Sequence, residues 1–105
     1  MKISKWTIAN IPDLTGKVII VTGGNSGIGY ESVKAFAQKG AEVILACRSV
    51  KKGEAAKAEI MKNNPAGKIE VMTLDLMDLS SVKNFAVRFK ENHSRLDVLL
   101  NNAGI

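Results

Sequence analysis

Residues 18–29 read Val18-Ile-Ile-Val-Thr-Gly-Gly-Asn-Ser-Gly-Ile-Gly29, an apolar run followed by a loop with four glycines in seven positions. The β-branched residues of the run predict a strand that is buried on both faces. The apolar spacing after Gly29 predicts a helix. A buried strand that leads through a glycine loop into a helix is a device for binding phosphate. The loop lets an anion approach the backbone, and the first N–H groups of the helix point at it.

The order of the glycines narrows the kind of phosphate site. The pattern is Thr22-Gly23-x-x-x-Gly27-x-Gly29, which differs from the G-x-G-x-x-G fingerprint of many dinucleotide-binding folds. No Gly-Lys-Ser/Thr ending follows the glycines, which excludes a P-loop of the Walker type. The glycine loop alone is therefore a weak signal, and the rest of the chain decides what it means.

Composition limits the class of protein. The chain has 105 residues, of which 46% are hydrophobic, and this is typical of one small globular α/β domain. The net charge of +5 comes with lysines spread over expected helix faces and few aromatics, so we expect no nucleic-acid binding. No apolar run is long enough to cross a membrane, and residues 1–10 lack the apolar core of a secretory signal. The single Cys47 cannot form an intrachain disulfide, and we expect a cytoplasmic protein that binds no membrane.

Strand and helix patterns alternate along the chain. Residues 1–16 contain turn signals and form a lead-in, and residues 17–105 form the expected domain. The predicted strands cover 17–22, 42–47, 68–74 and 96–100. The predicted helices cover 27–39 and 50–63, with Ser49 as the N-cap of the second, and a third begins after the N-cap Asp78. That third helix carries an apolar stripe of Val82, Phe85, Ala86 and Phe89.

This alternation predicts an α/β fold: a partial three-layer Rossmann-type, doubly wound parallel sheet of four strands in the order 3-2-1-4. In such a sheet the ligand lies at the switch point between the first and fourth strands. The glycine loop and residues 101–104 follow those two strands, so we expect the binding site there.

Three motifs at strand ends resemble those of the short-chain dehydrogenase/reductase family. They are Thr22-Gly-x-x-x-Gly-Ile-Gly29, Asp75 directly after the third strand, and Asn101-Asn-Ala-Gly104 after the fourth. The segments Leu45-Ala-Cys-Arg-Ser49 and Ile11-Pro-Asp-Leu-Thr-Gly-Lys17 resemble the retinol-dehydrogenase-like and protochlorophyllide-reductase-like branch. The resemblance covers the first half of the family's domain. It implies an oxidoreductase that transfers hydride between a nicotinamide cofactor and a carbonyl or alcohol substrate.

The resemblance also implies a role for each motif. The glycine loop would surround the cofactor pyrophosphate, Asp75 would bind the adenine amino group, and Leu76 would contact the adenine ring. The loop after the fourth strand would line the adenosine ribose. The alternatives are a plain tight turn for the glycines, a turn or cap role for Asp75, and a structural amide for Asn102.

The end of the second strand predicts which nicotinamide cofactor binds. A carboxylate there would bind the ribose 2′-OH of NAD and repel a 2′-phosphate. This chain instead has Cys47 and then Arg48, whose guanidinium matches phosphate geometry. We therefore predict NADP(H) over NAD(H), with a surface arginine that binds no ligand as the alternative. The expected cofactor-binding residues are Gly23, Asn25, Ser26, Gly27, Ile28, Gly29, Arg48, Asp75, Leu76, Asn102, Ala103 and Gly104.

Catalytic residues are not expected. The family's chemistry uses a Tyr-x-x-x-Lys pair, and Tyr30-Glu-Ser-Val-Lys34 matches that string. Tyr30 directly follows the glycine loop, however, so it would lie at the phosphate end of the helix and away from the nicotinamide. Tyr30 is the only tyrosine and His93 the only histidine, and the spacing of residues predicts no metal ligand and no Ser-His-Asp triad.

The sequence therefore predicts the dinucleotide-binding part of a longer oxidoreductase, truncated before its catalytic segment and inactive by itself. The alternative is a non-catalytic nucleotide-binding or interaction module. In either case the apolar run Val98-Leu-Leu100 would form an uncovered edge strand, which favours self-association.

Overall fold

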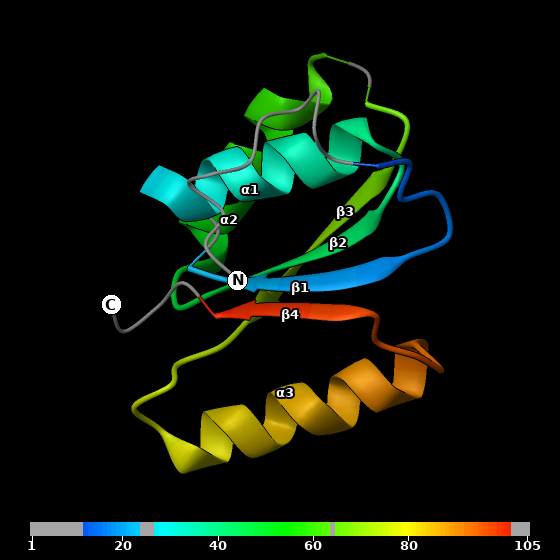
Figure 1. Ribbon diagram of the computed structural model, residues 1–105. Coiled ribbons are helices and arrows are strands. Elements are labelled where there is room, and N and C mark those ends of the chain that lie inside the picture. Colours follow the sequence, from blue (N-terminus) through cyan, green and yellow to red (C-terminus); the bar gives the residue numbers. More distant parts are fainter. Residues whose placement is uncertain (1–11, 24–26, 64, 102–105) are drawn as a thin grey trace.

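The computed structural model describes residues 12–23, 27–63 and 65–101 of the chain. Strands and helices alternate through these residues, as the sequence predicts (Figure 1). In chain order the elements are β1 (Val18–Thr22), α1 (Gly27–Gln38), β2 (Glu42–Cys47), α2 (Val50–Met61), β3 (Lys68–Thr73), α3 (Leu79–Asn92) and β4 (Val98–Asn101).

The strands form one parallel sheet in the order β3-β2-β1-β4. This confirms the predicted order 3-2-1-4, and it places β1 at the centre with β2 on one side and β4 on the other. Figure 1 shows α1 and α2 on one face of the sheet and α3 on the opposite face. The described part of the chain is therefore a three-layer Rossmann-type arrangement, as predicted.

The two faces of the sheet carry separate apolar clusters because successive strand residues point to opposite sides. Ile19 and Val21 of β1 pack toward α1 and α2, in the cluster that also contains Val33 and Ile60. The α3 face has its own cluster, formed by Val18, Ile20, Ile44, Ala46, Met72, Leu74, Phe85 and Phe89. All five residues of β1 are buried, which confirms the strand buried on both faces.

Helix α3 rests on the sheet through a narrower stripe than the sequence predicts. Phe85 and Phe89 are buried and Val82 packs against their cluster, but Ala86 is exposed. The two phenyl rings stack with their centroids 6.4 Å apart. The helix therefore contacts the sheet through Val82, Phe85 and Phe89, and the two phenyl rings form most of this contact.

The predicted N-caps are confirmed. Ser49 Oγ accepts a hydrogen bond from the N–H of Lys52 at 3.3 Å, and Asp78 Oδ1 accepts one from the N–H of Ser80 at 2.9 Å. The predicted ends differ by one or two residues: α2 ends at Met61, β3 ends at Thr73, and β4 begins at Val98. None of the helices in the described ranges is long and apolar enough to cross a bilayer.

Candidate functional site

The carboxyl ends of the parallel strands meet at one edge of the sheet. Thr22 is in register with Ala46 of β2 and Asn101 of β4, and Cys47 is in register with Thr73. Two backbone hydrogen bonds continue this edge past the strands. The N–H of Gly23 donates to Ala46 O, and the N–H of Leu74 donates to Cys47 O, both at 2.8 Å. The four strands therefore end side by side, and the segments that follow them all begin at the carboxyl edge of the sheet.

The glycine loop leaves β1 at Gly23 and enters α1 at Gly27. Both residues have positive φ, +65° and +59°, a backbone conformation that glycine adopts without the strain of a Cβ. A Cβ built on Gly27 would meet nothing within 4 Å in the described part of the chain. None of the described residues fills the space beside the first turn of α1, and Gly29 is buried two residues further on. A helix N-terminus is a favourable place for an anion.

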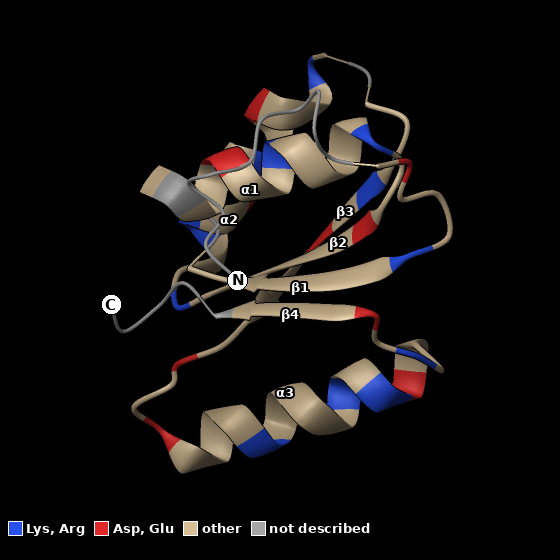
Figure 2. Ribbon diagram, viewed as in Figure 1, with Lys and Arg blue, Asp and Glu red and all other residues tan. Residues whose placement is uncertain are grey.

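The β2–α2 connection supplies positive charge to the same edge. Arg48 is exposed, directly after the buried Cys47 and directly before the helix cap Ser49. Figure 2 shows basic residues at this junction. Burial raises the pKa of the Cys47 thiol above its ordinary value, which favours the neutral thiol. Its sulfur also donates to the carbonyl of Ser49 at 3.2 Å.

Asp75 is held in a tight turn after β3. Its Oδ1 accepts a hydrogen bond from the N–H of Met77 at 3.0 Å, and its own N–H donates to Ser81 Oγ at 2.8 Å. The turn role considered from the sequence is therefore present. Oδ2 has no partner among the described residues, so the turn leaves one carboxylate oxygen available to a ligand. Leu76 is 40% exposed beside it.

Several of the predicted cofactor-binding residues lie outside the described ranges. They are Asn25 and Ser26 in the glycine loop, the side chain of Ile28, and Asn102, Ala103 and Gly104 after β4. The described residues that share the carboxyl edge are Gly23, Gly27, Gly29, Arg48, Asp75 and Leu76.

Tyr30 and Lys34 lie on α1, and Tyr30 belongs to its first turn. Tyr30 is half-buried and packs against the apolar cluster between the sheet and α1. This packing ties the ring to the scaffold and to the glycine-loop end of the helix. The interpretation of Tyr30-Glu-Ser-Val-Lys34 as a chance match to the family string fits this placement.

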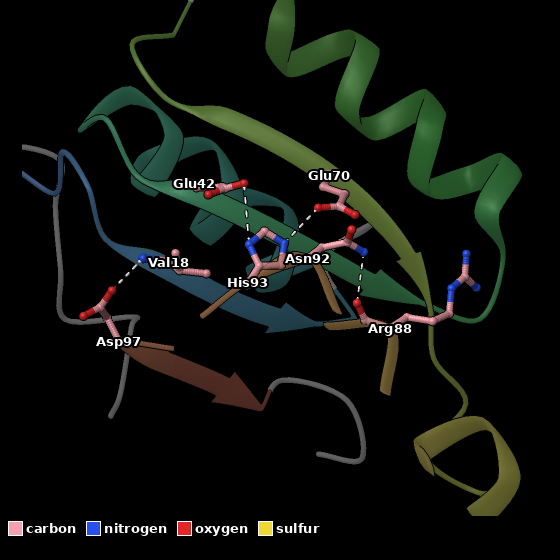
Figure 3. Close-up of polar contacts among 7 residues, drawn as sticks. All are labelled: Val18, Glu42, Glu70, Arg88, Asn92, His93 and Asp97. Carbon is pink, nitrogen blue, oxygen red and sulfur yellow. Dashed lines mark hydrogen bonds and ion pairs between the residues drawn. The ribbon is translucent and has the colours of Figure 1, made fainter. Parts of the chain in front are cut away.

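The structure also brings together a group that the sequence spacing does not predict. Glu42 of β2, Glu70 of β3 and His93 after α3 meet at the amino edge of the sheet, opposite the glycine loop (Figure 3). His93 Nε2 lies 3.1 Å from Glu70 Oε1, and His93 Nδ1 lies 3.8 Å from Glu42 Oε2. The sequence carries one signal for this group. Residues i and i+2 of a strand lie on the same face, and Ile44 and Met72, two residues after Glu42 and Glu70, belong to the apolar cluster under α3. Both glutamates are therefore expected on the α3 face of the sheet.

A parallel sheet in the order 3-2-1-4 with a glycine loop at its switch point defines a Rossmann-type, nucleotide-binding α/β protein. Residues 17–105 match the sequence profile of the short chain dehydrogenase family. The chain belongs to that family, which confirms the resemblance inferred from the three motifs.

The chain is similar to curated proteins from several organisms. It is 53% identical over 93 residues to the WW domain-containing oxidoreductase of Gallus gallus, covering 89% of this chain and 22% of that protein. It is 44% identical over 103 residues to retinol dehydrogenase 11 of Homo sapiens, covering 98% of this chain and 32% of that protein. The chain thus spans about a third or less of the length of these relatives.

Solved structures show the same arrangement. The menthone neomenthol reductase of Mentha piperita superimposes with a TM-score of 0.79 at 37% identity, covering 85% of this chain and 32% of the reductase. The RhlG/NADP active-site complex of Pseudomonas aeruginosa superimposes with a TM-score of 0.79 at 28% identity, covering 89% of this chain and 36% of that protein.

Proposed function

We propose that residues 17–105 form the cofactor-binding half of a short-chain oxidoreductase and bind NADP(H) in preference to NAD(H) along the carboxyl edge of the sheet. The observation that carries the preference is Arg48, an exposed cation directly after β2, where an NAD-binding chain would place a carboxylate. The relative from Pseudomonas aeruginosa, which shares the fold, is a complex with NADP.

Different segments of the chain would bind different parts of the cofactor, and the glycine loop would bind the pyrophosphate. Gly27 leaves room for the pyrophosphate at the N-terminus of α1, where the partial positive charge of the helix favours an anion. Gly23 and Gly29 would complete the loop around it, by resemblance to the family. Asn25, Ser26 and Ile28 would add loop contacts, by resemblance to the family.

The adenosine half would follow the β3 and β4 ends. The free oxygen of Asp75 would accept a hydrogen bond from the adenine amino group, and the exposed face of Leu76 would contact the ring. Asn102, Ala103 and Gly104 would line the ribose. When bound, the nicotinamide accepts or gives the hydride; the 105-residue chain supplies the binding.

We expect no residue of the 105-residue chain to transfer a proton to a substrate. Tyr30 lies in the first turn of α1 and packs against the apolar cluster, which supports a hydroxyl that lies away from the nicotinamide. We expect the chain to bind NADPH without oxidising it in the presence of a carbonyl compound. NADPH-dependent carbonyl reduction that is lost in Tyr30→Phe would contradict this placement.

Calorimetric titration with NADPH and NADH tests the cofactor preference. A hydrogen bond to a charged group contributes about 1.5–3 kcal/mol, so Arg48→Ala should weaken NADPH binding about 10- to 150-fold. Binding of NADH, which has no 2′-phosphate, should change little. Arg48→Asp should reverse the preference, because it places a carboxylate beside the ribose.

Lys62→Ala is the matched control. Arg48 precedes the start of α2, and Lys62 is an exposed cation that follows its last turn. Lys62→Ala should change neither affinity. An equal loss of NADPH and NADH binding in Arg48→Asp would show that Arg48 does not contact the 2′-phosphate.

A further inference from the structure

The cluster of Glu42, Glu70 and His93 joins three elements at the amino edge of the sheet. Glu42 begins β2, Glu70 is the third residue of β3, and His93 is the C-cap of α3. Register pairs Ile44 with Glu70, and strand alternation puts both glutamates on the face that α3 covers. Figure 3 shows the imidazole ring between the two carboxylates.

The charges in this cluster do not balance. Two carboxylates face one imidazole, and no lysine or arginine of the described residues pairs with either glutamate. Lys68 lies on the same face of β3 as Glu70, but it is exposed and forms no ion pair with it. Even a protonated imidazole would cancel only one of the two negative charges. A divalent cation would cancel both.

The donor atoms suit a transition metal. Imidazole nitrogen and carboxylate oxygen are ordinary zinc ligands, and one donor atom from each residue lies within 4.8 Å of the others. Bonds of about 2.0–2.1 Å to a tetrahedral zinc ion separate its ligands by about 3.3 Å. The 3.1 Å between His93 Nε2 and Glu70 Oε1 is close to that spacing. Glu42 faces the other ring nitrogen and has to turn its carboxylate to join them.

The His93 side chain is fixed by its packing, whereas the side chains of Glu42 and Glu70 are free to rotate. The His93 side chain is only 7% exposed and its ring stacks on Phe89, with the ring centroids 4.8 Å apart. The backbone N–H of His93 also donates a hydrogen bond to the carbonyl oxygen of Phe89 at 2.9 Å. The side chains of Glu42 and Glu70 are 39% and 41% exposed, so their carboxylates can rotate and leave room for a water ligand. The carbonyl end of α3, which carries partial negative charge, lies at the cluster and also favours a cation.

We propose that Glu42, Glu70 and neutral His93 bind one divalent transition-metal ion of the zinc type. The ion ties the end of α3 to β2 and β3, and its binding releases any proton that the imidazole holds. This site lies at the edge opposite the cofactor site and rests on different residues.

The test is calorimetric titration of the chelator-treated 105-residue chain with ZnCl2, with MgCl2 as the comparison ion. We expect one Zn2+ per chain, no comparable Mg2+ binding, and a thermal midpoint that rises with Zn2+ concentration. His93 is the only histidine in the chain, so NMR signals of histidine ring protons report on this residue alone. Those signals should shift with Zn2+ until one equivalent has been added.

Variants locate the ion. His93→Gln and Glu70→Gln should each weaken Zn2+ binding about tenfold or more. Glu59→Gln, which changes an exposed carboxylate paired with Lys62 on α2, should leave binding unchanged. Cys47→Ser should also leave it unchanged, because Cys47 ends β2 at the carboxyl edge of the sheet, opposite the cluster.

The proposal would be overturned by the absence of saturable binding, by binding that survives His93→Gln, or by binding that is lost in Cys47→Ser. If His93→Gln does not fold, Glu42→Gln replaces it, since that side chain is partly exposed and leaves the His93–Glu70 contact in place. Unshifted His93 ring signals in the unmodified chain at saturating Zn2+ would refute the site without any variant.

Discussion

Replacing Gly27 by alanine separates the binding role of the glycine loop from its structural role. Gly27 has φ +59°, and a Cβ added there meets nothing within 4 Å in the described part of the chain. The substitution therefore causes no steric overlap with those residues. Its cost to folding is the left-handed backbone conformation alone, about 1–2 kcal/mol for a residue with a Cβ.

Gly16 provides a matched control in the turn before β1. It has φ +84°, and a Cβ there also meets nothing within 4 Å in the same ranges, so Gly16→Ala should lose about the same stability. Gly16 precedes the amino end of β1, whereas Gly27 opens α1 beyond the carboxyl end. Only the Cβ at Gly27 would occupy the open space at the helix N-terminus.

The expected difference is in cofactor affinity. Loss of one hydrogen bond to the charged pyrophosphate costs about 1.5–3 kcal/mol, so Gly27→Ala should weaken NADPH binding about 10- to 150-fold. Gly16→Ala should leave it unchanged. Urea denaturation gives the stability of both variants, and calorimetric titration gives their affinity for NADPH. If the two variants bind NADPH equally well, the loop is a plain tight turn and the reasoning fails.

Three further outcomes follow from the packing and charges of the described residues. Gly53→Ala should destabilise the chain by about 1–3 kcal/mol in urea denaturation, because its Cβ would lie 2.7 Å from Cys47 Sγ. Hydrogen bonds from Arg95 lower the pKa of Asp97 in the folded chain. The ionised Asp97 carboxylate therefore stabilises the fold above the ordinary carboxyl pKa, and this stabilisation is lost as the pH falls through the lowered pKa of the folded state. Acid unfolding followed by circular dichroism should therefore be shallower in Asp97→Asn. Leu99 is 58% exposed on the edge strand β4, so light scattering should show self-association of the chain that Leu99→Lys removes; a monomer at all concentrations would contradict this.

Most of the fold could be predicted because the information is local. The β-branched run of β1 marks a strand buried on both faces, and Ser49 and Asp78 mark helix starts by capping chemistry that spans two or three residues. The strand order then follows from the Rossmann-type fold that the alternation and the glycine loop indicate, and not from any single residue. Exposed Ala86 could not be predicted, because helical spacing does not tell how far a helix with two large rings tilts on a sheet.

The two sites differ in predictability for the same reason. The residues at the carboxyl edge follow strand ends directly, so strand order alone places Gly23, Arg48 and Asp75 along one line. Glu42, Glu70 and His93 lie far apart in sequence, and their meeting depends on the register of β2 with β3 and on where α3 ends. No local spacing encodes either quantity.

The two edges should also act independently. From Glu42 to Cys47 the strand β2 rises about 17 Å, at about 3.3 Å per residue, which is roughly twice the screening length of about 8 Å at physiological ionic strength. A bound cation at Glu42 therefore has little electrostatic influence on a phosphate near Arg48. We expect saturating Zn2+ to raise the thermal midpoint while changing NADPH affinity by less than about twofold, and Glu70→Gln and Arg48→Asp to have additive effects on stability. A larger change in NADPH affinity would mean that β2 and β3 transmit a displacement from one edge to the other, and that the rigid-sheet argument is wrong even if both sites exist.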